Sequence, residues 1–165
     1  MYIARIKSIM SKILRYFIKH RTRTYFSFDF ALSFHGLIPE RAYMYTSAIE
    51  SHAKTSRKKK RTGKYLYMDI PEEAFECGVN LIYEGEGKIR IASPEKALCD
   101  KLYMMGRVRN LREMGELLEY ELRIDMEMLP NLNLNIIRKL SRLYPSENVK
   151  LLGDFIEKQR TCVRN

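Results

Sequence analysis

The stretch at residues 91–103, IASPEKALCDKLY, constrains the fold more than any other part of the chain. A short β-like run ends at Ser93, whose hydroxyl can accept from the free backbone N–H groups of a first helical turn. Pro94 follows at the first helical position, where its missing N–H costs nothing. Glu95 places negative charge near the positive end of the helix dipole. The sequence therefore predicts a strand-to-helix junction at Ser93, with a helix that stops at Gly106.

Alternating and turn-forming residues before this junction predict short strands. Residues 24–36 read as a strand followed by a buried helix, with Ser27 as its N-cap and Gly36 after its last turn. Two further runs, 42–49 and 65–70, read as the arms of a β-hairpin with a long cationic tip.

A second hairpin is predicted from residues 79–83 and 88–92, around the turn at 84–87. After the junction, apolar residues at helical spacing predict one helix across 111–122, another across 134–144 and a last one capped by Ser146. The expected fold class is α+β, with a small mixed or antiparallel sheet, packed helices and a helical C-terminal half.

The net charge of +10 is concentrated in two segments, residues 1–23 and 54–64. Each holds seven Lys/Arg and no acidic residue, which leaves sixteen basic against twenty acidic residues elsewhere. Such segments attract polyanions, either nucleic acid or an acidic protein surface. The remainder of the chain is mildly acidic.

Residues 1–19 predict a basic amphipathic helix, with Ile3, Ile6, Met10, Ile13, Leu14 and Phe17 on one side. This stripe could pack on the body of the protein or on a neighbouring chain, or the helix could lie on a membrane surface. A targeting peptide is disfavoured because no small-residue cleavage pattern follows. No apolar run approaches twenty residues, so no transmembrane span is expected.

Residues with catalytic potential do not form a convincing set. Glu95 and Asp100 would lie about 140° apart on a helix, and Lys96 with Asp100 at i, i+4 predicts a weak surface pair. Sites of acid–base or metal-dependent nuclease chemistry need further carboxylates than these. We therefore predict no enzymatic activity, no catalytic residue and no cofactor.

The histidines and cysteines also fail to suggest a metal site. The three histidines are far apart, and His35 is expected to bond locally near a helix end. Three cysteines without a C-x-x-C spacing argue against a disulfide framework or zinc and suit a reducing cytosol. Cys99 is expected to be a small packing residue.

The cationic run is the best candidate for a functional surface. It could be a solvated loop, but adjacent cations repel one another, and a bound polyanion would offset that cost. Tyr65 and Tyr67 could add base stacking or simply pack in a strand. Contact with nucleic acid would be mainly to phosphate. The candidate nucleic-acid-binding residues are Arg57, Lys58, Lys59, Lys60, Arg61 and Lys64.

Three stretches together resemble the AbiEi-type antitoxins of bacterial type IV toxin–antitoxin (abortive infection) systems. Residues 25–40, YFSFDFALSFHGLIPE, are similar to the family pattern Y-x-S-x-x-x-A-L-x-x-H-G-L-I-P-E. Residues 62–67, TGKYLY, resemble its T-x-x-G-x-Y-x-Y element more loosely. Residues 91–103 resemble I-A-x-P-E-K-A-L-x-D-x-x-Y, and the order of the three stretches agrees.

The resemblance implies a cytoplasmic, non-enzymatic antitoxin that opposes a nucleotidyltransferase-like toxin, its functional partner. Family members commonly repress their own operon by binding DNA, so transcriptional regulation is a further expectation. The family usually carries an N-terminal winged-helix domain, whereas only residues 1–23 precede the first motif here, so specific operator binding is not carried over. The alternative is a general nucleic-acid-binding protein that uses segments 1–23 and 54–64.

These readings divide the chain into three expected parts. Residues 1–23 form a basic helix that replaces or remains from a winged-helix domain. Residues 24–158 form the antitoxin-like body, with an α/β part at 24–105 and a helical part at 106–158. Residues 159–165 are expected to fray.

Overall fold

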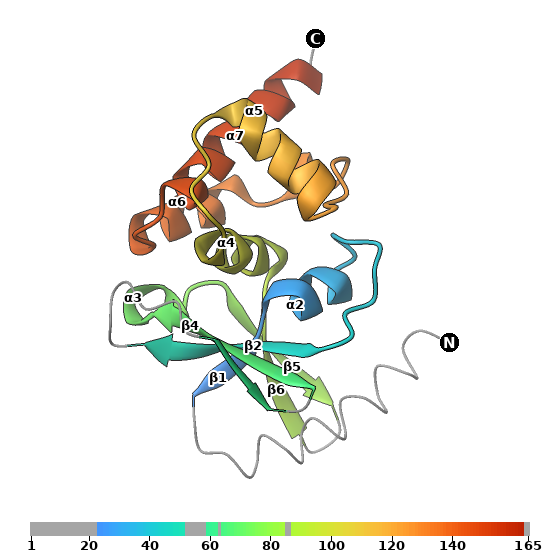
Figure 1. Cartoon of the computed structure of the whole chain (residues 1–165), viewed down its shortest axis with the longest axis vertical. Helices are drawn as coiled ribbons and strands as arrows, with labels where there is room; N and C mark the ends of the chain where they lie inside the picture. The colour runs from blue at the N-terminus through green and yellow to red at the C-terminus, as the bar shows by residue number, and fades with distance from the viewer. Residues whose placement is uncertain (1–22, 52–58, 63, 85–86, 164–165) are drawn as a thin grey trace.

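The computed structural model describes residues 23–51, 59–62, 64–84 and 87–163 of the 165-residue chain (Figure 1). The amphipathic helix predicted over residues 1–19 lies outside the described residues, and so do Arg57 and Lys58. The predictions made for them stay predictions.

Six strands form one mixed sheet in the order β3-β4-β2-β1-β6-β5. Strand β1 is central and pairs antiparallel with β2 and parallel with β6. The strands are β1 (Thr24–Phe26), β2 (Tyr45–Ser51), β3 (Lys59–Thr62), β4 (Tyr65–Pro71), β5 (Val79–Glu84) and β6 (Gly87–Ala92).

The predicted hairpin between residues 42–49 and 65–70 is wrong in its pairing. Strands β2 and β4 are neighbours but run parallel, and the antiparallel partner of β4 is β3, within the cationic run. The 13 residues from 52 to 64 are long enough for the crossover that parallel pairing requires. Polar and apolar side chains alternate in the same way in parallel and antiparallel strands, so the sequence pattern could not distinguish the two kinds of pairing.

Two local predictions from the sequence are confirmed. Strands β5 and β6 form an antiparallel hairpin, with Val79 opposite Ala92. Strand β1 leads directly into helix α2 (Phe28–Phe34), which ends at the C-cap His35. Gly36 then takes a positive φ of 74°, the conformation that favours glycine just after a helix.

The helical C-terminal half is also confirmed. Helix α4 (Pro94–Met104) begins as predicted, since Ser93 Oγ accepts from the N–H of Lys96, but it ends before Gly106 with Met105 as its C-cap. The last helix, α7, continues through residues expected to fray. The other helical elements are α3 (Glu72–Phe75), α5 (Leu111–Glu116), the π-helical turn η1 (Leu117–Glu121), the 3-10 turn η2 (Leu129–Asn131), α6 (Leu134–Leu143) and α7 (Glu147–Val163).

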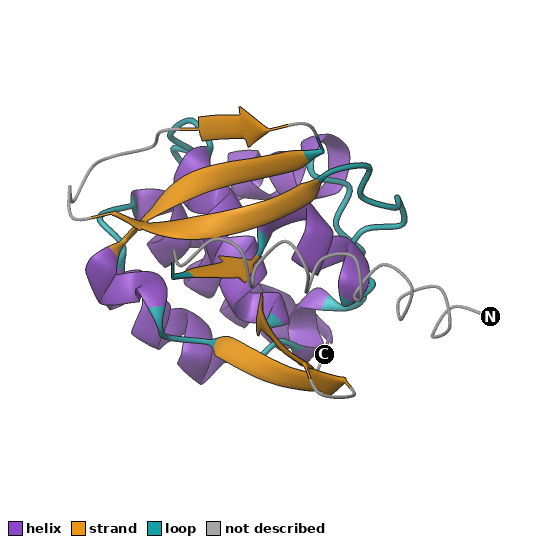
Figure 2. Ribbon diagram, turned by 90° about the horizontal axis from the view of Figure 1, so that it is seen from below, coloured by secondary structure: helices purple, strands orange, loops and turns teal. Residues whose placement is uncertain are grey.

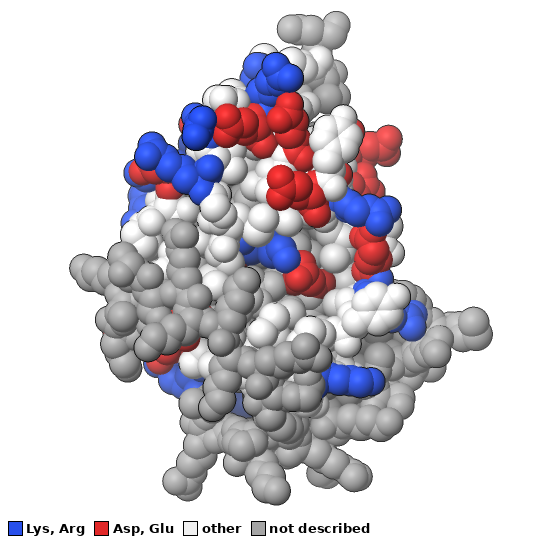
Figure 3. All heavy atoms as spheres, in the orientation of Figure 1, with Lys and Arg blue, Asp and Glu red and all other residues white. Residues whose placement is uncertain are grey.

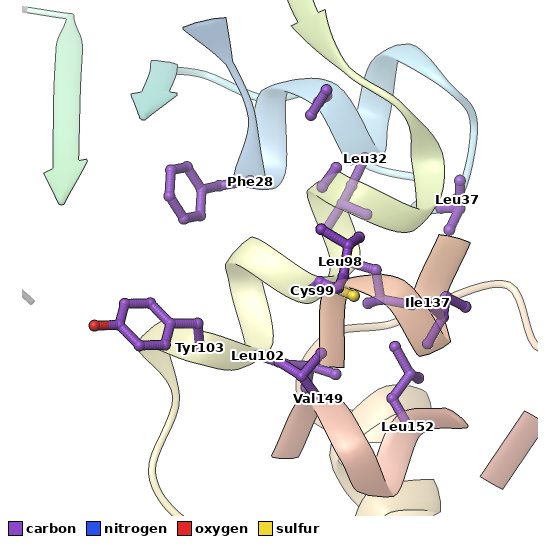
Figure 4. Close-up of a cluster of buried hydrophobic side chains, with 14 of the residues drawn as sticks. Phe28, Leu32, Leu37, Leu98, Cys99, Leu102, Tyr103, Ile137, Val149 and Leu152 are labelled. Carbon is purple, nitrogen blue, oxygen red and sulfur yellow. The ribbon is translucent and has the colours of Figure 1, made fainter. Parts of the chain in front are cut away.

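The described helices lie on one side of the sheet, which Figure 2 shows from the other side. Helix α4 is the middle layer: it lies between the sheet with α2 and the helices of the C-terminal half (Figure 1). Apolar side chains of these layers meet in one core, where Leu98 and Leu102 of α4 lie with Leu32, Ile137 and Leu152 (Figure 4). The fold class is therefore α+β, as predicted. Among the described residues, none of the helices combines the length and apolar character that crossing a membrane requires.

Candidate functional site

A buried ion pair occupies the centre of helix α4. Lys96 and Asp100 lie one turn apart, the side chains of both are fully buried, and Lys96 Nζ is 3.0 Å from Asp100 Oδ1. The sequence had predicted a weak surface pair, so this prediction is wrong. A buried carboxylate loses its hydration and needs hydrogen bonds as well as a counter-charge.

Asp100 receives those hydrogen bonds from elements distant in the sequence. Tyr25 of β1 donates its hydroxyl to Oδ2 at 2.9 Å, and Ser27 donates to the same oxygen at 2.5 Å. Tyr144, the C-cap residue of α6, donates to Oδ1, which also faces the Lys96 ammonium. Four donors match the roughly four acceptor positions of a carboxylate. The protein's own groups thus supply partners for both carboxylate oxygens.

Lys96 uses its ammonium group equally fully. Besides Asp100, Nζ donates to the backbone oxygen of Ala74 in α3 at 2.7 Å and to the hydroxyl of Tyr144. These three acceptors correspond to the three N–H donors of an ammonium group. The Lys96–Asp100 network, formed by these two residues with Tyr25, Ser27, Ala74 and Tyr144, therefore joins β1, α2, α3, α4 and α6.

The two tyrosines of the network are held in the protonated form that donates. Burial raises the pKa of Tyr25 well above its ordinary value, and the charge of Asp100 raises it further. The pKa of Tyr144 is raised by the same two causes in the same order. Ionised phenolate would add a second negative charge beside Asp100, so donation from the neutral hydroxyl is the stable arrangement.

Ser27 occupies the N-cap position predicted for it, but its side chain has another role. Its hydroxyl donates to Asp100 rather than accepting from the first turn of α2. The buried carboxylate is a strong acceptor, and the hydroxyl is turned toward it and away from the N–H groups of the first turn. The sequence located the start of α2 correctly but did not reveal that the Ser27 side chain bonds to Asp100.

Glu95 and His35 connect neighbouring elements instead of forming an acid–base pair. Glu95 Oε1 accepts from the backbone N–H of Asn133, the N-cap of α6, at 2.8 Å. His35 Nε2 lies 2.8 Å from the backbone oxygen of Ala92, 57 positions away, so the expected local bond is wrong. Burial lowers the pKa of His35 and favours the neutral ring, whose Nε2–H donates.

Cys99 is a packing residue, as predicted. It is fully buried in the core, and burial raises the pKa of its thiol. A protonated, inaccessible thiol is a poor nucleophile. Within the described residues no group of three or more His, Cys, Asp or Glu side chains could hold a metal ion.

These contacts assign the charged residues of the 91–103 stretch to structure. Lys96 and Asp100 are closed off from solvent, and Glu95 is only 8% exposed. Glu95 and Asp100 accept hydrogen bonds from opposite ends of α6, at Asn133 and Tyr144. The arrangement supports rigid docking of layers, and the remaining charged residue of the stretch, Lys101, pairs with Asp29 of α2.

Two groups of charged residues in the described part of the chain lie at separate places. Part of the cationic run forms the edge strand β3, and Lys64 beside it is exposed. Acidic side chains gather on the helical half in Figure 3. From α5 to η2 the exposed acidic residues are Glu116, Glu119, Glu121, Asp125 and Glu127.

The candidate nucleic-acid-binding residues are thus only partly placed. The backbone of Lys59, Lys60 and Arg61 belongs to β3, and Arg57 and Lys58 lie outside the described residues. Tyr65 packs its ring 5.1 Å from that of Tyr45, which favours the packing alternative for this tyrosine.

Sequence reasoning missed the three side chains that donate to Asp100, those of Tyr25, Ser27 and Tyr144, and the backbone oxygen of Ala74. Tyr144 carried a usable signal, because it ends an apolar helical stripe, and a buried tyrosine hydroxyl usually has a hydrogen-bond partner. No short-range pattern links it to Asp100, 44 positions earlier.

Comparison with known proteins leaves the chain without a match: no family model matches it, and no curated protein does either.

The stability losses from removing the two charges of the buried pair should be non-additive. We expect Lys96→Met and Asp100→Asn each to lower the free energy of unfolding by about 3–5 kcal/mol, because each leaves the other charge buried and unpaired. The double variant should be more stable than the sum of the single effects predicts, by at least about 1 kcal/mol. Urea denaturation of all four proteins measures this coupling.

Lys101→Met is the matched control on the same helix. Its ammonium pairs with Asp29 at 2.7 Å, but both side chains are partly exposed. The loss should stay within about 1 kcal/mol. Equal losses for Lys96→Met and Lys101→Met, or additive effects in the double variant, would contradict the buried-network account.

The lowered pKa of His35 predicts a pH dependence of stability. The unfolded chain binds a proton near pH 6.5, whereas the folded protein binds it only at lower pH, so stability should fall as the pH drops below about 6.5. His35→Gln should flatten the dependence in that interval. Urea midpoints from pH 5 to 8 for both proteins provide the measurement, and parallel profiles would contradict the prediction.

Proposed function

We propose that the chain is the antitoxin-like body of an AbiEi-type system, opposing a nucleotidyltransferase-like toxin in the bacterial cytoplasm. One observation carries the proposal: residues of the first and third resembling stretches contact one another. Tyr25 and Ser27 of the first stretch donate to Asp100 of the third. His35 and Ala92 form a second such contact.

These contacts support the resemblance because they give its scattered residues a common physical purpose. Polar residues shared with the family pattern are the ones that dock β1 and α2 onto α4. A chance similarity in two separate stretches would have no reason to supply matching donors and acceptors. These contacts are what supports the resemblance, and the resemblance is the basis for proposing the family's activity.

The proposed activity is non-enzymatic and depends on surfaces. Three charged groups of the 91–103 stretch, Glu95, Lys96 and Asp100, are committed to internal contacts. What remains for partners is the outside of the body, where the cationic edge and the acidic residues after α5 lie apart. Direct contact with the toxin, regulation of its synthesis, or both would be consistent with this arrangement.

Co-expression with the toxin from the adjacent reading frame tests the proposal. We expect the chain to restore growth to cells in which the toxin alone arrests it, because an antitoxin opposes its cognate toxin. Colony counts after induction of the toxin provide the measurement, with the level of folded chain checked in the same cells.

A frameshifted gene and the destabilised Asp100→Asn variant serve as controls for this experiment. The frameshift should give no rescue, and the variant should rescue only as far as it folds. Continued growth arrest in the presence of abundant, folded wild-type chain would overturn the proposal.

A second candidate function is general binding of nucleic acid through the basic segments. The observation that favours it is the position of β3, which places part of the cationic run along an edge of the sheet. An edge strand has a neighbour on one side only, so a polyanion could approach along the other.

Replacing Lys58, Lys59, Lys60 and Arg61 by Ala should then weaken binding of arbitrary duplex DNA sharply. The logarithm of the binding constant falls linearly with the logarithm of the salt concentration, and each phosphate contact contributes about −0.9 to the slope. Loss of up to four contacts should therefore make this slope shallower by up to about 3.6. Fluorescence anisotropy at several salt concentrations measures both effects.

A control variant removes four exposed cations from the helical half and leaves the same net charge. Binding that weakens equally in both variants, or in neither, would contradict a role for the cationic run. The control residues are Lys139, Arg142, Lys150 and Lys158.

A further inference from the structure

The two edges of the sheet differ in how they are protected from further strand pairing. Strand β3 forms one edge with the sequence KKRT, and a row of cations disfavours the approach of another strand. Strand β5 forms the other edge with the sequence VNLIYE, which has no proline and a single charged residue, Glu84. Among the described residues β5 has a neighbouring strand on one side only, and its sequence lacks the charges that usually protect such an edge.

Backbone hydrogen bonds at the start of β5 show which of its residues face the open edge. Ser93, directly after β6, donates its N–H to the backbone oxygen of Gly78, so Gly78 is bonded across the hairpin. The N–H of the next residue, Val79, instead donates within the turn that precedes β5. Because the two orientations alternate along an antiparallel strand, Leu81 and Tyr83 direct their N–H and C=O groups away from β6.

The side chains of these same two residues are exposed. Leu81 is 49% exposed and Tyr83 74%, and both lie on one face of β5, since alternate residues of a strand share a face. A single exposed apolar side chain is common on a protein surface. Two on one strand, at the residues whose backbone groups face the open edge, form a template for a further strand.

We infer that β5 pairs antiparallel with β5 of a second copy of this chain, about a two-fold axis at Ile82. In this register Leu81 of each copy lies opposite Tyr83 of the other. The backbone groups that face the open edge then bond to one another, and the exposed side chains cover each other. The sheet continues through both copies.

The sequence of β5 favours its own copy as the partner. A two-fold axis is the commonest symmetry of protein dimers, and it requires a surface that is complementary to itself. Antiparallel self-pairing places apolar residues opposite apolar residues at the three central positions, 81, 82 and 83. It also places the two Glu84 residues at opposite ends, whereas parallel pairing would bring these like charges side by side.

The size of the contact sets the expected strength of the dimer. About five residues of each copy take part, which is small compared with the roughly 20–30 residues on each side of a standard interface. We therefore expect a reversible dimer that forms at concentrations of about 10 μM and above. This inference concerns assembly and does not rest on the proposed antitoxin activity.

Sedimentation velocity of the full chain over a range of concentrations tests the pairing. We expect the mass to rise from the 19.6 kDa of one chain toward twice that value. Tyr83→Lys should raise the midpoint concentration at least about tenfold, because it places a cation on the pairing edge. A folded wild-type chain that keeps the mass of one chain up to about 500 μM would overturn the inference.

Tyr120→Lys is the matched control for this variant. Tyr120 is similarly exposed, at 71%, and belongs to η1 in the helical half rather than to the sheet. It should leave the midpoint concentration unchanged. Equal shifts in the two variants, or no shift in either, would overturn the inference.

Disulfide trapping tests the register and serves as a second test if Tyr83→Lys fails to fold. In a Cys162→Ser background, which removes the exposed cysteine, Ile82→Cys should form a linked dimer on mild oxidation. The two copies of residue 82 would face each other as a non-hydrogen-bonded pair, whose Cα atoms are close enough for a disulfide. Leu81→Cys should link more slowly, because residue 81 lies opposite residue 83.

Equal linking of the two cysteine variants would overturn the register and with it the inference. A chain that stays single but binds an alternating threonine–valine peptide would assign the edge to a strand of a different protein, which would also overturn it.

Discussion

The carboxylate of Asp100 is the group on which the arrangement of layers depends. It is fully buried and compensated by Lys96, Tyr25, Ser27 and Tyr144, which come from four different elements. An uncompensated charge at this depth would cost several kcal/mol. Separation of any one of these elements from the others would therefore expose the Asp100 carboxylate to solvent or leave it without one of its partners. Apolar packing around α4 supplies the bulk of the cohesion, and the network fixes its geometry.

This use of charge changes how the chemistry of the chain is read. Glu95, Lys96 and Asp100 are residue types that acid–base sites use. Each of them instead makes a contact that joins elements of the fold. Their neighbours are hydroxyls and backbone groups of the protein itself. A function carried by the outer surface is consistent with that, and it makes the separation between the cationic edge and the acidic residues after α5 relevant to partner choice.

The sequence by itself determined the features that short-range interactions decide. The Ser93 cap, the glycine after α2 and the β5–β6 hairpin involve neighbours within a few positions, so residue type and spacing were sufficient. Only the tertiary structure decided that Lys96 and Asp100 are buried, because i, i+4 spacing is the same on a surface and in a core. It also decided the parallel pairing of β2 with β4. The burial of the ion pair and the direction of strand pairing both depend on partners tens of residues away. The alternation of a strand and the period of a helix do not identify those partners.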